Sequence, residues 1–229
     1  LLATEDAQRT VRQTLVAQVA TAYLALLELD YELDIARRTY AARTNSLGLT
    51  AADVETATQW LREARIAAPF VALAPGSIWG SKQWPHFPEL ARRLAGRAGV
   101  VVVGSREDAP LAAQIVGAAN ACGALTLRQS AALIQQASVL VTNDSAPLHF
   151  AQAAGTPTVA IFGPTIPAFG FGPRGPRDQV LGVEGLTCRP CSPHGPARCP
   201  LGHHSCMQAL AVEEVVRAIE ATSALHRRG

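Results

Sequence analysis

Short apolar runs alternate with helical patterns through the last two thirds of the chain. Each run is rich in valine, leucine, isoleucine or alanine, as expected for a strand that is buried on both faces of a parallel sheet. Right-handed helical crossovers between such strands give a doubly wound, Rossmann-like α/β domain. The predicted strands are 70–74, 100–103, 138–141, 158–162 and 179–183, and the predicted helices are 87–95, 107–119, 130–137, 147–154 and 212–224.

The region before residue 69 is almost free of turn-forming residues. Residues 1–68 contain no proline and one glycine, Gly48, whereas all 15 prolines lie beyond. From Glu5 to about Arg43 apolar residues recur at helical spacing between charged ones, which predicts a long amphipathic α-helix. A second short helix is expected over 51–64, after Thr50. We therefore expect a helical segment over 1–48, a linker helix over 49–69 and an α/β domain over 70–229.

The composition limits the classes of function. Of the 229 residues 48% are hydrophobic and 17% are charged, which allows a substantial core. The formal net charge of +2 argues against a nucleic-acid-binding protein that relies on a broad basic surface. No apolar stretch reaches the roughly 18 residues of a membrane-spanning helix, and no signal peptide is recognisable. The sequence begins at Leu1 without methionine, so we expect a fragment of a longer protein.

The loops that leave the predicted strands are candidate sites, because a doubly wound sheet binds ligands beyond the carboxyl ends of its strands. The loop over 74–85 holds two glycines together with Ser77, Ser81 and Lys82. The glycines let the backbone approach a ligand, the hydroxyls can donate hydrogen bonds, and the lysine provides a charge suited to phosphate. The spacing of a P-loop is absent. The alternative is a surface loop with a solvated lysine.

Two acidic residues follow the second predicted strand. Glu107 and Asp108 stand in its exit loop, where a carboxylate can accept hydrogen bonds from ribose hydroxyls. The same side chains would also favour the N-terminus of the next helix, because the helix dipole attracts negative charge. The sequence leaves both interpretations open.

The loop over 142–149 carries the most informative pattern. It reads Thr-Asn-Asp-Ser-Ala-Pro-Leu-His, and it leaves an apolar strand and enters a helix. Asp144 or Ser145 is the candidate N-cap, and Pro147 suits the first helical turn. The unpaired amides of such a helix end bind anions such as a diphosphate, and His149 follows about one turn later. The alternative is ordinary capping with a buried histidine.

Four motifs in this order carry a family resemblance. They are Pro75-Gly76-Ser77 with Lys82-Gln83-Trp84-Pro85, the loop over 142–149, the segment Gly155-Thr156-Pro157-Thr158-Val159-Ala160-Ile161-Phe162-Gly163-Pro164-Thr165, and a cysteine-rich segment. Together, over about residues 50–229, they resemble the lipopolysaccharide heptosyltransferases, especially the second type. These enzymes transfer a heptose from ADP-heptose to the inner core of lipopolysaccharide.

The resemblance implies the C-terminal half of a GT-B fold, with ADP-heptose as donor and a lipid A–core oligosaccharide as acceptor. It also implies peripheral association with the cytoplasmic face of the inner membrane. No cofactor is required for transfer, because Lys82 and the helix end at Ser145 can neutralise the departing charge without a metal ion. By the same resemblance Ser77 and Lys82 would bind the donor phosphates, Glu107 the adenosine ribose, and Asp144, Ser145, Ala146 and His149 would line the diphosphate and the sugar.

One component of such enzymes is not recognisable in the sequence. The family has an N-terminal domain that binds the acceptor and supplies a carboxylate as general base. No acidic residue in 1–50 stands in a plausible strand-exit loop, so we predict no general base. We expect the chain alone to be inactive or very weakly active. The alternative function is a non-catalytic module that binds an ADP-sugar.

Four of the five cysteines fall within nineteen residues: Cys188, Cys191, Cys199 and Cys206. One C-x-x-C pair with two further cysteines has the character of a structural zinc site, in which four thiolates complete a tetrahedral shell. A reduced, metal-free turn and a disulfide are the alternatives. Cys122 stands apart and is most simply a buried, small apolar residue.

The N-terminal segment has a resemblance of its own. Residues 12–27, followed by 33–38, resemble a helix of the outer-membrane efflux channel family. The similarity covers only this segment, which lacks a strand that could contribute to a barrel. It predicts a remnant or a fusion, and an efflux-related structural protein is therefore a third hypothesis. A packing face is the simpler interpretation of the apolar stripe.

Overall fold

The computed structural model describes residues 47–223 and, before them, residues 4, 7, 10, 13–15, 18–19 and 21–23. The chain divides into two compact units, Leu1–Asn45 and Ser46–Gly229. In the first unit every described residue is helical, in agreement with the predicted helix, and the apolar Leu15, Val19 and Tyr23 are exposed. The rest of that helix, with most of the efflux-like stretch, lies outside the described residues. The division at residues 48 and 69 stays a prediction.

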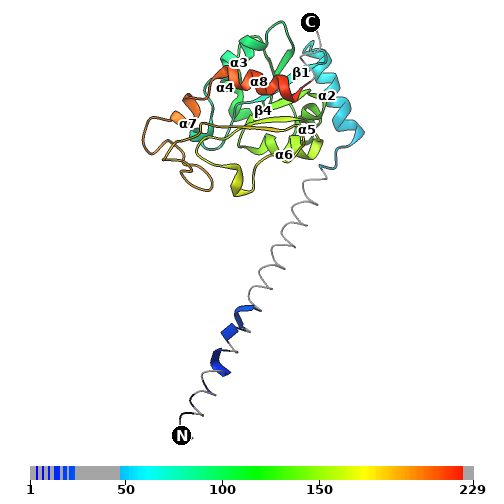
Figure 1. Ribbon diagram of the computed structural model, residues 1–229. Coiled ribbons are helices and arrows are strands. Elements are labelled where there is room, and N and C mark those ends of the chain that lie inside the picture. Colours follow the sequence, from blue (N-terminus) through cyan, green and yellow to red (C-terminus); the bar gives the residue numbers. More distant parts are fainter. Residues whose placement is uncertain are drawn as a thin grey trace. The chain divides into compact units, whose positions relative to one another are not determined.

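The second unit contains a six-stranded, entirely parallel sheet (Figure 1). The strand order is β3-β2-β1-β4-β5-β6, which is the order of the Rossmann fold. The predicted doubly wound α/β fold is therefore confirmed. The strands are β1 (Phe70–Ala74), β2 (Gly99–Val102), β3 (Ala119–Asn120), β4 (Val139–Asn143), β5 (Thr158–Ile161) and β6 (Gln179–Leu181).

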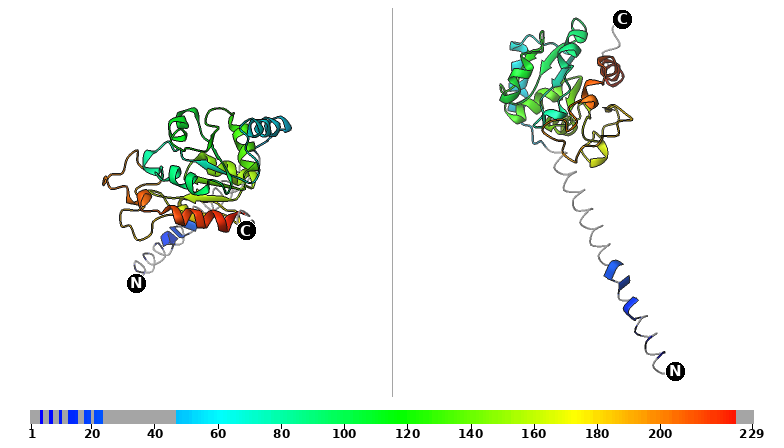
Figure 2. Two further views of the ribbon diagram at one scale, coloured as in Figure 1. Left: turned by 90° about the horizontal axis from the view of Figure 1, so that it is seen from above. Right: turned by 90° about the vertical axis from the view of Figure 1, so that its left-hand side faces the viewer.

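Helices cover both faces of this sheet, as Figure 2 shows for α2 and α8 on opposite sides. One apolar core joins α3 and α8 to alternate residues of the central strands, and the other joins α2, α5 and α6 to the residues between them. The central strands are buried along their whole length, which explains their continuous apolar runs. The helices are α2 (Ala51–Glu63), α3 (Phe87–Leu94), α4 (Ala109–Ala112), α5 (Leu127–Gln136), α6 (Ala146–Ala154), α7 (Ser205–Gln208) and α8 (Val212–Thr222).

The helix predicted over 107–119 is wrong. The chain forms a 3₁₀ turn, η2 (Arg106–Asp108), then the short α4, and it enters the unpredicted strand β3. Gly117 has a φ of 87°, a left-handed conformation that an α-helix cannot continue through. Strand β3 escaped prediction because two residues are too few to show a periodic pattern.

Two further 3₁₀ turns shape the loops at the carboxyl edge of the sheet. They are η1 (Gly80–Lys82), which follows β1, and η3 (Pro167–Phe169), which follows β5. Among the described residues, no helix is long and apolar enough to cross a membrane.

Candidate functional site

A cavity of about 1320 Å³ opens at the carboxyl ends of the strands. The exit loops of β1, β2 and β4 form much of its wall. The chain runs from β1 outward to β2 and β3 and then returns to β4 on the other side of β1, so the cavity lies at the point where the strand order reverses. Open α/β sheets bind their ligands at this point. All seven predicted donor-binding residues line the cavity: Ser77, Lys82, Glu107, Asp144, Ser145, Ala146 and His149.

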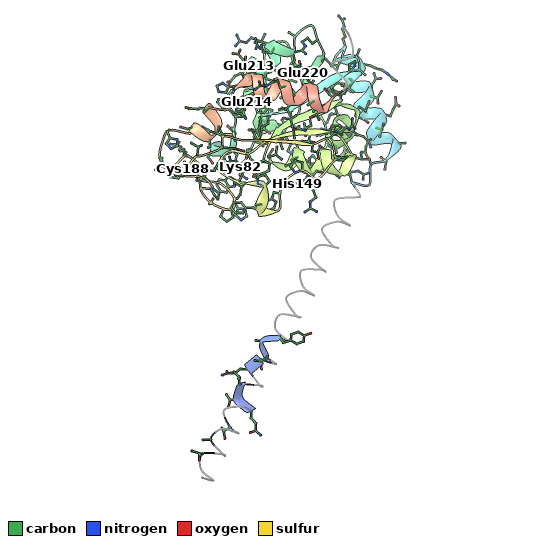
Figure 3. All side chains as sticks on the ribbon, viewed as in Figure 1. Lys82, His149, Cys188, Glu213, Glu214 and Glu220 are labelled. Carbon is green, nitrogen blue, oxygen red and sulfur yellow. The ribbon has the colours of Figure 1, made fainter. Side chains whose placement is uncertain are left out.

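Lys82 and Asp144 form a buried ion pair at this cavity. The Nζ of Lys82 lies 2.6 Å from Oδ2 of Asp144, and the two side chains are only 10% and 7% exposed. The same carboxylate oxygen accepts a hydrogen bond of 2.7 Å from Oγ1 of Thr165. Lys82 is the one lysine in the sequence, and Figure 3 places it, like His149, in the lower part of the domain as drawn. The pair is held in a desolvated setting, where the loss of one partner leaves an uncompensated charge.

The N-terminus of α6 borders the cavity without a side-chain cap. Ser145 takes the N-cap position with extended backbone, but its hydroxyl makes no capping hydrogen bond. The Ser145 Oγ instead lies 3.4 Å from both Thr142 Oγ1 and the carbonyl oxygen of Asn143. Backbone amides at this helix end therefore remain available to an anion, and the helix dipole favours negative charge there.

Asn143 joins the exit loops of β1 and β4. Its Nδ2 donates to the carbonyl oxygen of Pro75 at 2.8 Å, and its Oδ1 accepts a hydrogen bond from the amide of Trp84 at 3.2 Å. Asn143 is fully buried. The indole nitrogen of Trp84 in turn donates to the carbonyl oxygen of Leu210. This network fixes the loop that carries Lys82 against the strand that leads to Asp144.

Asp108 occupies the position between the exit loops of β1 and β2. Its Oδ2 accepts hydrogen bonds from the amide and the hydroxyl of Ser105, at 2.8 and 3.0 Å. A Cβ atom at Gly76 would overlap this carboxylate, and one at Gly104 would lie 2.7 Å from Oδ2. The two glycines therefore allow the acid to approach both strand ends. Asp108 caps η2, as the alternative interpretation of this loop expected.

Glu107 lies beside Asp108 and also lines the cavity, but its side chain is exposed. Its own backbone amide and the Ser105 side chain lower the pKa of Glu107. Both carboxylates can therefore reach a ligand in the cavity, and the choice between them as ribose acceptor stays open to experiment.

His149 meets an aromatic ring at the cavity wall. The ring of Phe171 lies edge-on to it, with ring centroids 6.4 Å apart and an interplanar angle of 69°. Phe171 follows Gly170, which has a φ of 92°, so the loop after η3 turns back toward α6. The histidine is therefore part of an accessible wall and is not the buried core residue of the alternative interpretation.

The cysteine-rich segment packs against the loops of the cavity. The imidazole Nε2–H of His204 donates to the carbonyl oxygen of Ser81 at 2.7 Å, and the Ser81 hydroxyl donates to the carbonyl oxygen of Pro196. The amide of Cys191 donates to the carbonyl oxygen of Pro164 at 2.8 Å. The guanidinium of Arg189 donates to the carbonyl oxygens of Val183 and Thr165, at 2.7 and 3.2 Å. This segment thus supports the residues on either side of the ion pair.

The four clustered cysteines are free thiols, and no disulfide joins them. Burial, and then the neighbouring thiols, raise the pKa of Cys191 and of Cys206. Backbone amides, first that of His204, lower the pKa of Cys199. Within the described part of the chain, no three His, Cys, Asp or Glu side chains are arranged to hold a metal ion. The predicted disulfide alternative is wrong for this structure, and the predicted zinc site is not confirmed.

Cys122 is partly buried and separate from that cluster. Burial, with a smaller contribution from Asp108, raises the pKa of its thiol to about 12. The thiol is therefore protonated at neutral pH and unreactive.

Sequence reasoning missed several residues of the site. Asn143 and Thr165 both stood in predicted strand-exit loops, but their contacts with Pro75 and Asp144 join chain segments far apart in sequence, and so does the contact of His204 with Ser81. His194 and Phe171 also line the cavity, from segments that were not predicted to contribute to the donor site. Asp108 was recognised as a candidate, and the glycines at 76 and 104 were the available signal for its close approach.

Comparisons with known proteins identify relatives of this chain. A family model described as "Glycosyltransferase family 9 (heptosyltransferase)" matches residues 7–198, which begins earlier than the predicted resemblance. Lipopolysaccharide heptosyltransferase 2 of Salmonella typhimurium is 35% identical over 114 residues, covering 44% of this chain and 33% of that protein. Lipooligosaccharide heptosyltransferase 2 of Campylobacter jejuni is 29% identical over 168 residues, covering 67% and 51%.

Solved structures show the same fold. ADP-heptose LPS heptosyltransferase II of E. coli superposes with a TM-score of 0.59 at 25% identity, covering 76% of this chain and 51% of that one. A family 9 glycosyltransferase of Veillonella parvula superposes with a TM-score of 0.63 at 23% identity, covering 76% and 52%. The chain spans between one third and about half of the length of these curated relatives. On the match over most of its length, the chain belongs to glycosyltransferase family 9, the heptosyltransferase family.

Proposed function

We propose that residues 47–223 are the donor-binding half of a heptosyltransferase and that the cavity holds ADP-heptose. The observation that carries the proposal is the buried pair of Lys82 and Asp144 beside the uncapped N-terminus of α6. A diphosphate at this position would meet an ammonium group and free backbone amides together. Ser77 would add a hydroxyl, and Glu107 or Asp108 would accept hydrogen bonds from the ribose.

In the proposed reaction an acceptor hydroxyl attacks C1 of the heptose and gives its proton to the general base that the family's acceptor-binding domain supplies. The bond from C1 to the terminal phosphate oxygen breaks, and its electron pair leaves with ADP. Lys82 and the amides of Ser145 and Ala146 stabilise the charge that develops on this oxygen, which lowers the barrier only if these contacts strengthen in the transition state. Asp144, Ala146 and His149 line the side of the cavity that would hold the sugar.

Calorimetric titration with ADP tests donor binding. We expect binding by the wild-type chain and about a tenfold or greater loss of affinity in Lys82→Ala, since a hydrogen bond to a charged group contributes roughly 1.5–3 kcal/mol. The exposed Arg62, which pairs with Glu55 on α2, provides the matched control in Arg62→Ala. Absence of ADP binding by a folded wild-type chain would contradict the proposal.

The second candidate is a module that binds an ADP-sugar without transferring it. Two of the three acids that line the cavity favour it, because Asp144 is already bound by Lys82 and Thr165, and Asp108 by Ser105. The third, the exposed Glu107, lies in the loop that the proposed donor site assigns to the ribose. Transfer of heptose from ADP-heptose to a lipid A–core acceptor by this chain, at the rate of an intact enzyme, would exclude the second candidate.

We propose the remaining features of the function from the family. The acceptor is a lipid A–core oligosaccharide rather than a nucleic acid, and the protein works in the cytoplasm at the face of the inner membrane. Sedimentation with vesicles that contain the lipid A–core acceptor, compared with acceptor-free anionic vesicles, tests this location. Binding only to the acceptor-free vesicles would contradict the proposed acceptor.

We also propose that the cysteine-rich segment takes up a structural zinc ion. Cys188, Cys191, Cys199 and Cys206 supply four thiol ligands of the preferred kind, and Sγ of Cys199 already accepts the amide of His204 at 3.4 Å. The thiols would have to move closer together to share an ion. Metal analysis of protein purified without added zinc should find one zinc per chain, and metal-free folded protein would contradict the proposal.

A further inference from the structure

His194 lies at the donor cavity but has no role in the function described above. The cysteine-rich segment brings it there, together with Pro193. The side chain is exposed, and no hydrogen bond to it is found among the described residues. Its chemistry is therefore available to a ligand.

The backbone next to His194 is fixed against Lys82. A Cβ at Gly195 would lie 3.0 Å from Cε of Lys82, so this glycine packs directly on the lysine side chain, and Gly195 itself is buried. The Ser81 hydroxyl donates to the carbonyl oxygen of Pro196, one residue further on. His194 therefore sits at the edge of the cavity beside the residue that the proposed function assigns to the donor phosphates.

Acidic side chains outnumber permanently basic ones on the cavity wall. The wall contains two permanently basic side chains, Lys82 and Arg106, against the three acids Glu107, Asp108 and Asp144. The charge of Lys82 is moreover offset by Asp144 at 2.6 Å. The N-terminus of α6 adds about half an elementary charge. A nucleoside diphosphate carries at least two negative charges, so a group on the wall that gains a proton would favour its binding.

We propose that His194 contacts the donor diphosphate as an imidazolium ion, so that donor binding takes up a proton. This inference rests on the proposed function and deepens it. An imidazole is the side chain that can gain a proton near neutral pH, and a phosphate within hydrogen-bonding distance favours its charged form. The charged or titratable groups around it are Lys82, Arg106, Glu107, Asp108, Asp144 and His149 on the cavity wall, and Cys191, Arg198 and Cys199 on its own segment.

Calorimetry in buffers of different ionisation enthalpy measures the proton uptake directly. Above about pH 7.5 the phosphate of free ADP is already deprotonated, so any proton gained on binding goes to the protein. We expect the wild-type chain to take up about half a proton or more, and its Kd for ADP to rise about five- to tenfold between about pH 7 and pH 8.5. Adenosine, which lacks the diphosphate, should bind without uptake.

Three variants assign the proton. His194→Gln should lose most of the uptake and bind ADP about tenfold more weakly at about pH 7. His194→Arg carries a permanent charge, so it should bind ADP tightly with no uptake and little pH dependence. His86→Gln is the control, because the imidazole of His86 donates to the carbonyl oxygen of Gln208 away from the cavity. His149→Gln shows how much of the uptake belongs to the second histidine.

The outcomes separate this inference from the proposed function. If ADP binds but no proton is taken up, or if His194→Gln retains the full uptake, the role of His194 is overturned while the donor site stands. If loss of uptake follows His149→Gln alone, the proton belongs to His149 and the inference is also overturned. If ADP does not bind at any pH, the proposed function fails together with the inference.

Discussion

The Nζ of Lys82 and Oδ2 of Asp144 lie 2.6 Å apart, although 62 positions separate the two residues in the sequence. Lys82 ends η1 in the loop that follows β1, and Asp144 begins the loop that follows β4. Because β1 and β4 are neighbours in the sheet, their exit loops meet at one edge. The ion pair therefore marks the point where the strand order reverses, at the floor of the cavity.

Removal of Lys82 should destabilise the fold as well as the donor site. In Lys82→Ala the buried Asp144 carboxylate keeps only the hydrogen bond from Thr165. The loss of one partner of a buried ion pair lowers the free energy of unfolding by about 3–5 kcal/mol. Urea denaturation measures this change. Arg62→Ala, which removes a pair exposed by 65% and 72%, should cost about 1 kcal/mol or less. Equal effects of the two variants would contradict a buried, coupled pair.

A methyl group at residue 76 should disturb the site through Asp108. In Gly76→Ala the new Cβ overlaps the Asp108 carboxylate, so we expect a loss of roughly 1–3 kcal/mol from overpacking. The double variant Gly76→Ala with Asp108→Ala removes the overlapping atoms and should recover part of the loss. Thermal unfolding of the single and double variants provides the test. Additive effects would show that the two residues do not press on one another.

Asn143 should be the most costly polar residue to truncate in the loop network. Asn143→Ala leaves the buried carbonyl oxygen of Pro75 and the amide of Trp84 without their partner, at a cost of roughly 2–3 kcal/mol. Asn120, whose exposed side chain accepts one hydrogen bond from the amide of Cys122, provides the matched control. Asn120→Ala should lower the free energy of unfolding by less than about 1 kcal/mol. A similar loss of unfolding free energy in both variants would argue against the network.

The thiols should react with iodoacetamide in an order set by their pKa values. Backbone amides lower the pKa of Cys199, so it holds the larger thiolate fraction, whereas the pKa of about 12 leaves Cys122 protonated until strongly alkaline pH. Mass spectrometry of peptides after brief alkylation at about pH 8 should find Cys199 modified well before Cys122. As pH rises, Cys199 should become reactive first. Modification of Cys122 first would contradict these shifts.

Zinc would alter the same order of reactivity in a recognisable way. A bound ion holds all four clustered thiolates and would protect Cys188, Cys191, Cys199 and Cys206 together. Addition of a chelator should then restore the fast reaction of Cys199. Reactivity that is unchanged by chelator would contradict a bound metal.

Most of the local structure of residues 70–223 could be predicted from the amino-acid sequence. Continuous apolar runs identified five of the six strands, and proline, serine and glycine positions identified the loops that line the cavity. These predictions succeeded because side-chain periodicity and turn chemistry are properties of neighbouring residues. The same local signals failed at 107–119, where Gly117 and a two-residue strand interrupt the helical pattern.

Which of these loops meet depends on the tertiary structure. The strand order places β1 between β2 and β4, and this places Lys82 against Asp144 and lets Asp108 reach Gly76. The same folding brings His194, more than a hundred positions later, to the rim beside Lys82. Contacts of this kind depend on the direction and order of the crossovers rather than on residue type. For that reason the chemical character of the loops could be predicted from the sequence, but the pairing of their side chains could not.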